Sequence, residues 1–267
     1  MHRILSYFRS VPGRIKLALP LAKNDFRSRY ATSQLGMFWA FFRPIIMAGV
    51  YVFVFAVIAR AAPIGGNYPY SLWMLPGLIV WFFFSESISS GVNTLNEYSY
   101  LVKNIRFNIS ILPDIKVFAA LFIHLFFVLL ILILYALFGL PFKPHMLQLP
   151  YYMFSCFCFT LAVNRIIAAI QPFFKDLSSA IEIALMVGIW ACPIMWDLSM
   201  VEEQYRFLFM ANPLFYLVNG YRESYMGDLW VWNHPILFIG FWAVTIILDL
   251  WGRRLFRRLS CQFADVI

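Results

Sequence analysis

Several ionisable residues of this chain lie within long apolar segments, where an unpaired charge is costly, and two of them point to a function. Glu86 follows a Trp-Phe-Phe-Phe run, and Arg43 precedes Pro44 in an aromatic-rich segment. A charged group in hydrocarbon destabilises a structure unless it faces protein or water. Glu86 is therefore either a structural partner, of Arg165 or of a backbone group, or part of a path for a polar solute. Arg43 either extends its charge to the lipid headgroups or binds an anionic headgroup.

No motif for catalysis or nucleotide binding accompanies these residues. The sequence contains no Gly-Lys-Ser/Thr, Gly-x-Ser-x-Gly, His-Glu-x-x-His or Gly-x-Gly-x-x-Gly. The cysteines and histidines are scattered and predict neither a metal site nor an extracellular disulfide. We expect no cofactor in this chain, and any ATPase that works with it must be another subunit. A membrane-embedded transferase is disfavoured, because the few intramembrane ionisable groups form no catalytic constellation.

The elements that must position Glu86 and Arg43 are long apolar helices. Hydrophobic residues make up 62% of the sequence and charged residues 13%, which leaves too few polar side chains to cover a water-soluble surface. Crossing a bilayer core of about 30 Å takes about 20 apolar helical residues. The sequence thus predicts an all-α integral membrane protein with six transmembrane helices. Their expected ranges are 35–58, 71–92, 117–139, 150–170, 178–196 and 235–251.

The distribution of basic residues predicts the orientation of these helices. With the N-terminus inside, 16 Lys and Arg residues fall on the cytoplasmic side and four on the other side, so both termini are expected in the cytoplasm. The net charge of +8 is explained by this asymmetry and by a role of basic residues in binding anionic membrane lipids. It requires no nucleic-acid partner. Segment 1–34 has the apolar spacing of an amphipathic helix in the cytoplasmic interface. Residues 35–267 then form one transmembrane domain.

Aromatic residues run through the whole of the first predicted span. Individually, such residues are expected to face lipid or to pack against other helices. Collectively, they would provide a smooth stacking surface along which a sugar or polyol chain slides. The residues considered for this path are Phe38, Trp39, Phe42, Tyr51 and Phe55, together with Glu86.

Several runs along the chain resemble one family of transport proteins. In chain order they are LGMFWAFFRPIIMAGVYVFVF from Leu35, LWMLPGLIVWFFFSESISSGVNTL from Leu72, LVKNIRFNISILPDIKV from Leu101, KDL from Lys175, CPIMWDL from Cys192, NPLFYLVNGYRESYMGD from Asn212 and a terminal FADVI from Phe263. In this order the sequence is similar to the membrane subunits of type-2 ABC exporters, which move polysaccharides and related polymers. Within that family it most resembles permeases for wall teichoic acid, and O-antigen and capsule permeases share much of the pattern.

The resemblance implies ATP-driven export. Permeases of this family work as homodimers with two copies of a separate ATP-binding cassette subunit, which binds ATP and Mg²⁺. Their substrate is a polymer linked to a polyprenyl pyrophosphate lipid, here expected to be wall teichoic acid. An O-antigen or capsular polysaccharide permease and a drug exporter of the same fold are the alternatives. The resemblance also implies a bacterial cell membrane as the location.

Roles for particular residues follow from the same resemblance. Arg27, Arg29 and Arg43 would attract the pyrophosphate at the cytoplasmic entrance. Segment 93–116 would couple the permease to the ATPase, and segment 197–234 would form short re-entrant helices that gate the outer mouth. The coupling residues are Tyr100, Lys103, Asn104 and Arg106, and the gate residues are Asn212, Pro213, Tyr221, Arg222 and Glu223.

Overall fold

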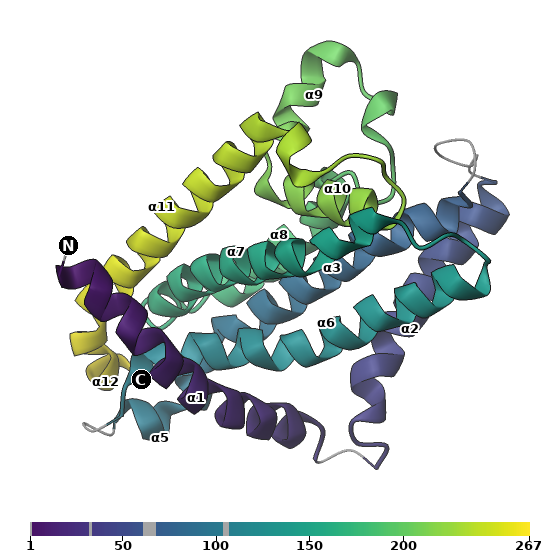
Figure 1. Cartoon of the computed structure of the whole chain (residues 1–267). Helices are drawn as coiled ribbons and strands as arrows, with labels where there is room; N and C mark the ends of the chain where they lie inside the picture. The colour runs from purple at the N-terminus through teal and green to yellow at the C-terminus, as the bar shows by residue number, and fades with distance from the viewer. Residues whose placement is uncertain (1, 32–33, 61–67, 104–106) are drawn as a thin grey trace.

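A computed structural model of the chain describes residues 2–31, 34–60, 68–103 and 107–267, without the side chains of residues 2–15 and 264. The described residues form helices and connecting turns with no extended strand, which confirms the all-α expectation (Figure 1). Within this part of the chain, five helices are long and apolar enough to cross a membrane. They are Phe38–Ile58, Tyr70–Val92, Ile109–Leu137, Pro144–Ile170 and Pro235–Gln262.

Each long helix contains one main α-helical element. These elements are α2 (Phe38–Val52), which continues as the π-helix η1 (Phe53–Ile58), α3 (Tyr70–Val92), α6 (Leu112–Leu137), α7 (Leu149–Ile170) and α11 (Pro235–Leu259). Pro113, Pro150 and Pro235 stand in the first turn of α6, α7 and α11. Proline suits this place because the first helical N–H groups have no partner within the helix.

The fifth predicted span in chain order is shorter than expected. Range 178–196 corresponds to α8 (Leu177–Ala191), whose 15 residues extend about 22 Å at about 1.5 Å per residue. Cys192 is extended, with ψ 135°, because proline at position 193 disfavours helical backbone in the residue before it. Ile194 and Met195 follow in a buried turn. The described residues therefore contain five long apolar helices and one short one, in place of six equivalent spans.

Helices α3, α6 and α7 form the centre of the bundle, and α11 packs along α7. The buried residues Leu72, Met74 and others of α3 belong to one hydrophobic cluster with residues of α6 and α7. A Cβ on Gly91 of α3 would overlap the Asn164 side chain of α7. The Asn164 amide donates to the Pro113 carbonyl at 2.9 Å, so one polar side chain links the three helices.

Helix α2 and its continuation η1 contribute little to this core. Ala40 is the one buried residue among them, and their packing contacts are mainly with α3. Apolar residues such as Ile46 and Phe53 are about half exposed. The first predicted span thus lies at the periphery of the single chain.

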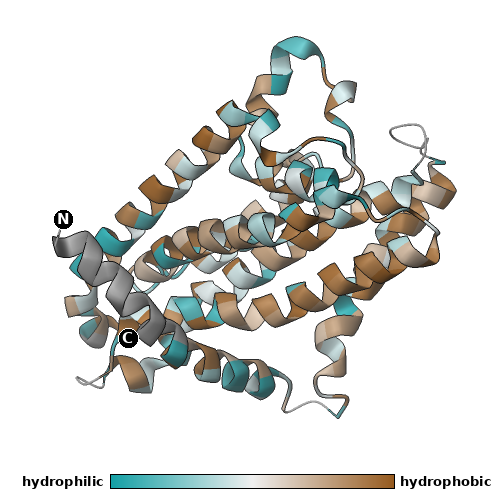
Figure 2. Ribbon diagram, in the orientation of Figure 1, coloured by the Kyte–Doolittle hydropathy of each residue, from teal (hydrophilic) through white to brown (hydrophobic). Residues whose placement is uncertain are grey.

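Apart from α8, the other helices gather at two opposite ends of the long helices (Figure 1). Figure 2 shows hydrophobic residues along the helices between these ends. The end that holds both termini is the α1 end, and the opposite one is the α10 end. The α1 end contains α1 (His2–Tyr30), α4 (Thr94–Glu97), α5 (Ser99–Val102) and α12 (Phe263–Val266), and the α10 end contains α9 (Glu203–Met210) and α10 (Pro213–Tyr225).

Candidate functional site

A cavity of about 210 Å³ lies between α1, α2, α3 and α6. Trp39 and Arg43 line it from α2, one helical turn apart, and Glu86 lines it from α3. Tyr30 at the end of α1 and His124 of α6 also face it, and most of the remaining wall is apolar. The fold therefore brings three of the sequence-predicted residues, Trp39, Arg43 and Glu86, to one place.

Glu86 is held by an arginine of α1. Arg29 Nη1 lies 2.9 Å from Glu86 Oε1, and Arg29 Nη2 lies 2.7 Å from Asp25 Oδ2. The side chain of Glu86 is 43% exposed, whereas that of Asp25 is 4% exposed. The interpretation of Glu86 as a partner of Arg165 is thus wrong, because its partner is Arg29. Arg27, the third basic residue predicted at the entrance, is exposed on α1.

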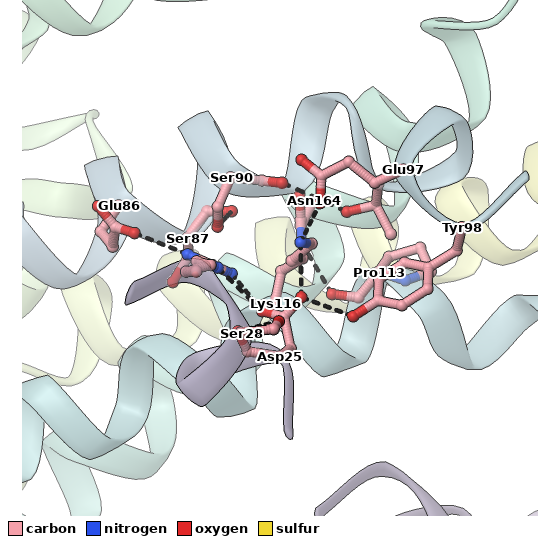
Figure 3. Close-up of polar contacts among 12 residues, drawn as sticks. Asp25, Ser28, Glu86, Ser87, Ser90, Glu97, Tyr98, Pro113, Lys116 and Asn164 are labelled. Carbon is pink, nitrogen blue, oxygen red and sulfur yellow. Dashed lines mark hydrogen bonds and ion pairs between the residues drawn. The ribbon is translucent and has the colours of Figure 1, made fainter. Parts of the chain in front are cut away.

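A buried lysine of α6 extends this network (Figure 3). The Lys116 ammonium, 1% exposed, donates to Asp25 Oδ1 at 2.8 Å and also to Glu97 of α4. The Tyr98 hydroxyl donates to the same Asp25 oxygen at 2.6 Å. Removal of one partner from a buried ion pair leaves an uncompensated charge. The contacts of Lys116 and Asp25 thus connect α1, α6 and the α4–α5 segment, and Arg29 connects this group to α3. Breaking one of these contacts is expected to be costly.

The charge of Asp25 follows from these contacts. Burial by itself raises the pKa of the Asp25 carboxyl. The charges of Arg29 and Lys116, together with the hydrogen bonds from Lys116 and Tyr98, outweigh this effect and bring the pKa below its ordinary value. Burial has the opposite effect on the cation Arg29 and lowers its pKa. The carboxylates of Asp25 and Glu86 outweigh burial and raise the pKa of Arg29 above its ordinary value. Both side chains are therefore charged at neutral pH.

Arg165 belongs to a second ionic network at the α1 end. Its guanidinium binds Asp114 of α6, with Nη2 2.9 Å from Oδ1, and also binds Asp249 of α11. Asp249 Oδ2 accepts from Arg253 Nε at 2.6 Å, and residues four apart on one helix are neighbours on its surface. This network joins α6, α7 and α11.

The aromatic residues of the first span do not form one continuous lining. Of the five residues considered, Trp39 alone lines the cavity. The rings of Phe38 and Phe42 stack with their centroids 4.7 Å apart. Tyr51 and Phe55 pack against the hydrophobic core, and Phe55 stacks on an aromatic ring of α3. The two halves of the predicted row thus have different surroundings.

The predicted coupling segment presents exposed side chains while it is attached to the first network. Tyr100 of α5 is 67% exposed, and Lys103 is also exposed. Asn104 and Arg106 lie outside the described residues. Because Glu97 and Tyr98 bind Lys116 and Asp25, the segment and α1 are held as one unit.

At the α10 end, three of the predicted gate residues have structural contacts. Asn212 caps α10 by accepting the Leu214 N–H at 3.0 Å, and Pro213 occupies its first turn. Tyr221 is buried, and its hydroxyl lies 2.6 Å from His124 Nε2. These contacts fix the start of α10 and its packing against α6.

Arg222 is buried and binds backbone. It donates to the carbonyls of Trp73 at 3.2 Å, Pro193 at 2.7 Å and Ile194 at 2.6 Å. Its guanidinium carbon lies 3.4 Å from the centroid of the Trp73 ring. Arg222 therefore joins α10 to the start of α3 and to the turn after α8. The neighbouring Glu223 lines a second, larger cavity.

The charged residues that sequence reasoning missed are Asp25, Glu97 and Lys116. Lys116 directly precedes the predicted span 117–139, and a lysine at such a boundary is a signal that a carboxylate partner is needed. The identity of the partner is not local, because Asp25 is 91 residues away. No periodicity in the sequence connects the two positions.

Comparison with known proteins gives concordant matches. The sequence profile of the ABC-2 type transporter family matches residues 19–226. The O-antigen export system permease protein RfbA of Myxococcus xanthus is 29% identical over 254 residues, which cover 94% of this chain and 95% of that protein. The protein of the same name from Klebsiella pneumoniae is 24% identical over the same coverage. The family match includes every residue of the first ionic network and the residues that line the cavity.

Proposed function

Since the chain belongs to the ABC-2 type transporter family, we propose that it moves a lipid-linked polysaccharide outward in an ATP-driven exporter. The chain is a multi-pass permease of the bacterial cell membrane. In the proposed exporter two copies of it form a homodimer with two copies of a separate ATP-binding subunit. The relatives named above are O-antigen export permeases, which supports an O-antigen-like polysaccharide as the substrate. Wall teichoic acid, favoured by the sequence motifs, becomes the second candidate.

The observation that carries this proposal is the position of Arg43 in the cavity. Among the described residues Arg43 has no ion-pair partner, whereas Arg29 and Arg165 each bind two carboxylates. An arginine that faces a cavity without a carboxylate partner is suited to a phosphate or pyrophosphate. Trp39, one turn away, offers an aromatic surface to an attached sugar. Glu86 repels the anion less because Arg29 neutralises it.

The first network suggests how ATPase closure reaches this cavity. A force on the exposed part of the coupling segment acts on Glu97 and Tyr98, and through them on Asp25 and Lys116. Arg29, bound to both Asp25 and Glu86, passes the displacement of α1 to the wall of the cavity. For coupling to occur, ATP binding must favour one arrangement of this network over another. Arg27, exposed on α1, would meet the anionic headgroup first.

The proposal is tested in proteoliposomes that contain the permease with its ATP-binding subunit and a lipid-linked polysaccharide. ATP should move polymer to the trans side, where a lectin detects it, and the polymer should stimulate ATP hydrolysis. Arg43→Ala should raise the half-saturating substrate concentration about tenfold or more, the effect of losing a charged hydrogen bond. Arg254→Ala, an exposed arginine of α11, should leave it unchanged.

Three results would contradict the proposal. Stimulation by drugs without stimulation by lipid-linked polymers would indicate a drug exporter of the same fold. A strong preference for a lipid-linked polyol phosphate over a polysaccharide would restore wall teichoic acid as the substrate. Equal effects of Arg43→Ala and Arg254→Ala would remove Arg43 from the binding site.

A further inference from the structure

A second cavity, of about 470 Å³, lies at the α10 end of the chain. Its walls come from the start of α3, the turn after α8, and α10 with the residues that follow it. Ligand sites in proteins commonly measure about 300–1,000 Å³, so this cavity is large enough for a small organic group. It is separate from the Arg43 cavity, with which it shares no lining residue.

The cations of this cavity are already bound by protein groups. The Lys143 ammonium donates to Asp228 at 2.8 Å and to the Met226 carbonyl at 2.8 Å, and Asp228 raises the pKa of Lys143. Arg222 donates to three backbone carbonyls and lies against the Trp73 ring. Neither cation is therefore free to take a phosphate without breaking contacts of the fold.

Other polar groups of the cavity retain capacity for a ligand. Asn219 has no hydrogen-bond partner among the described residues, so its amide can both donate and accept. Asp197 uses one carboxylate oxygen to accept the Ser199 N–H at 2.8 Å. Glu223 adds a second carboxylate, and Tyr68 adds a half-buried ring. An amide, two carboxylates and an aromatic ring provide acceptors and donors for hydroxyl groups beside an apolar surface for a sugar ring.

The charge of the lining distinguishes between ligand classes. Lys143 and Arg222 face three carboxylates, those of Asp197, Glu223 and Asp228, so the lining carries a net charge of −1 when all five groups are ionised. A polyanion such as a polyol phosphate is repelled by this surplus, whereas a neutral hydroxyl-rich unit is not. The described residues contain no group of three or more His, Cys, Asp or Glu side chains placed for a metal ion, which disfavours a metal centre in this cavity.

We propose that this cavity is a saccharide-binding subsite that takes neutral pyranose units of the exported polymer. The inference rests on the proposed function, because it assigns a contact for the same polymer at the opposite end of the chain. The distribution of basic residues predicts that this end lies on the outer side of the membrane, away from the cytoplasm. A unit held there is a unit that has already crossed, so its binding opposes backward sliding of the chain.

The test uses the purified complex of the permease with its ATP-binding subunit and saturation-transfer NMR with two probes. The probes are a neutral mannose oligosaccharide and a glycerol phosphate oligomer of similar length. The neutral probe should receive saturation and the anionic probe should not. Asn219→Ala and Asp197→Asn should each weaken binding of the neutral probe about three- to tenfold, the range for one lost hydrogen bond. Asparagine at position 197 still accepts the Ser199 N–H, so the turn is retained.

Gln204→Ala is the matched control, because Gln204 is exposed on α9 and does not line the cavity. The control and both variants should show the melting temperature of the parent complex. Unchanged binding of the neutral probe in both variants, no binding of it to the parent complex, or stronger binding of the anionic probe would each overturn the subsite. Transport of lipid-linked polysaccharide, measured on the same parent complex, separates this failure from failure of the proposed function. Transport without binding of the neutral probe would contradict only the subsite. Binding of the neutral probe without transport would contradict the exporter proposal.

Discussion

Lys116 Nζ and Asp25 Oδ1 lie 2.8 Å apart, although 91 residues separate them in the sequence. Both side chains are almost completely buried. The pair joins α1, at the predicted membrane interface, to α6, one of the long apolar helices. It makes α1 part of the packed structure and connects the coupling segment to it through Glu97.

Replacement of Lys116 by Met should therefore destabilise the protein strongly. The variant leaves Asp25 buried and deprived of one cation, and loss of one partner from a buried pair costs about 3–5 kcal/mol. Lys103→Met is the matched control, because Lys103 is exposed, and its effect should stay within about 0.5 kcal/mol. Thermal melting of both purified variants measures the difference. Equal melting temperatures would show that the buried pair does not stabilise the fold.

The same pair predicts a pH dependence with a defined sign. Because the folded-state pKa of Asp25 is depressed, the stabilisation from its carboxylate is fully present above the ordinary pKa of an aspartic acid. It is lost as the pH falls through the lower folded-state value. The stability difference between the parent and Asp25→Asn should thus be constant between about pH 6 and 8, a window well above that value, and shrink in stronger acid. A difference that grows on acidification would contradict the ionic assignment.

Glu86→Gln should affect coupling more than stability. Glu86 is 43% exposed, and ion pairs with such exposure contribute about 0–1 kcal/mol. Loss of the bond to Arg29 breaks the ionic link between α1 and the part of the cavity wall that α3 provides, so polymer-stimulated ATP hydrolysis should fall several-fold while basal hydrolysis persists. Glu182→Gln, an exposed carboxylate of α8, serves as the control. Identical stimulation in both variants would exclude a role for the Arg29–Glu86 bond in coupling.

Gly220→Ala should destabilise the α10 end. A Cβ at Gly220 would overlap the Tyr152 ring of α7, and overpacking of this kind costs about 1–3 kcal/mol. Gly240→Ala on α11 meets no atom within 4 Å, and it should be neutral or stabilising by up to about 1 kcal/mol through helix propensity. Melting temperatures of the two variants in the same detergent test this. A stable Gly220→Ala variant would mean that α10 and α7 are farther apart than described.

Trp39→Ala and Phe55→Ala should separate the cavity wall from helix packing. Trp39 lines the cavity and is 36% exposed, so its truncation should impair polymer transport at a stability cost of about 1 kcal/mol. Phe55 is partly buried and packs against the core. Its truncation should lower the melting temperature more than that of Trp39 does, by part of the about 3–5 kcal/mol that a fully buried Phe→Ala change costs. Transport and melting are measured on the same preparations. A parallel loss of both quantities in both variants would return Trp39 to a packing role.

The orientation is tested by cysteine labelling in intact cells. Cys261 is exposed, so the background carries Cys261→Ser. Glu203→Cys at the α10 end should react with an impermeant thiol reagent, and Lys103→Cys at the α1 end should react only after the membrane is opened. The reverse pattern would place the α1 end outside and invert the proposed export direction.

The sequence by itself determined the properties that depend on local composition. Uninterrupted apolar runs predicted an all-helical membrane protein, because a helix satisfies its own backbone hydrogen bonds within one segment. The i, i+4 pair of Asp249 and Arg253 was equally predictable, since residues four apart are neighbours on a helix. The prediction for range 178–196 was less accurate, because hydropathy did not register the break that Pro193 imposes after Ala191.

Only the tertiary structure decided which distant residues meet. Hydropathy marked Glu86 and Arg43 as unusual, but the partner of Glu86 proved to be Arg29 of α1, and Lys116 and Asp25 paired over 91 residues. The tertiary structure also distinguished Trp39, which faces a cavity, from Phe55, which packs against the core. The physical reason is that a helix presents several faces to different neighbours. Which face a residue occupies is set by how helices pack, and that packing depends on contacts across the whole chain.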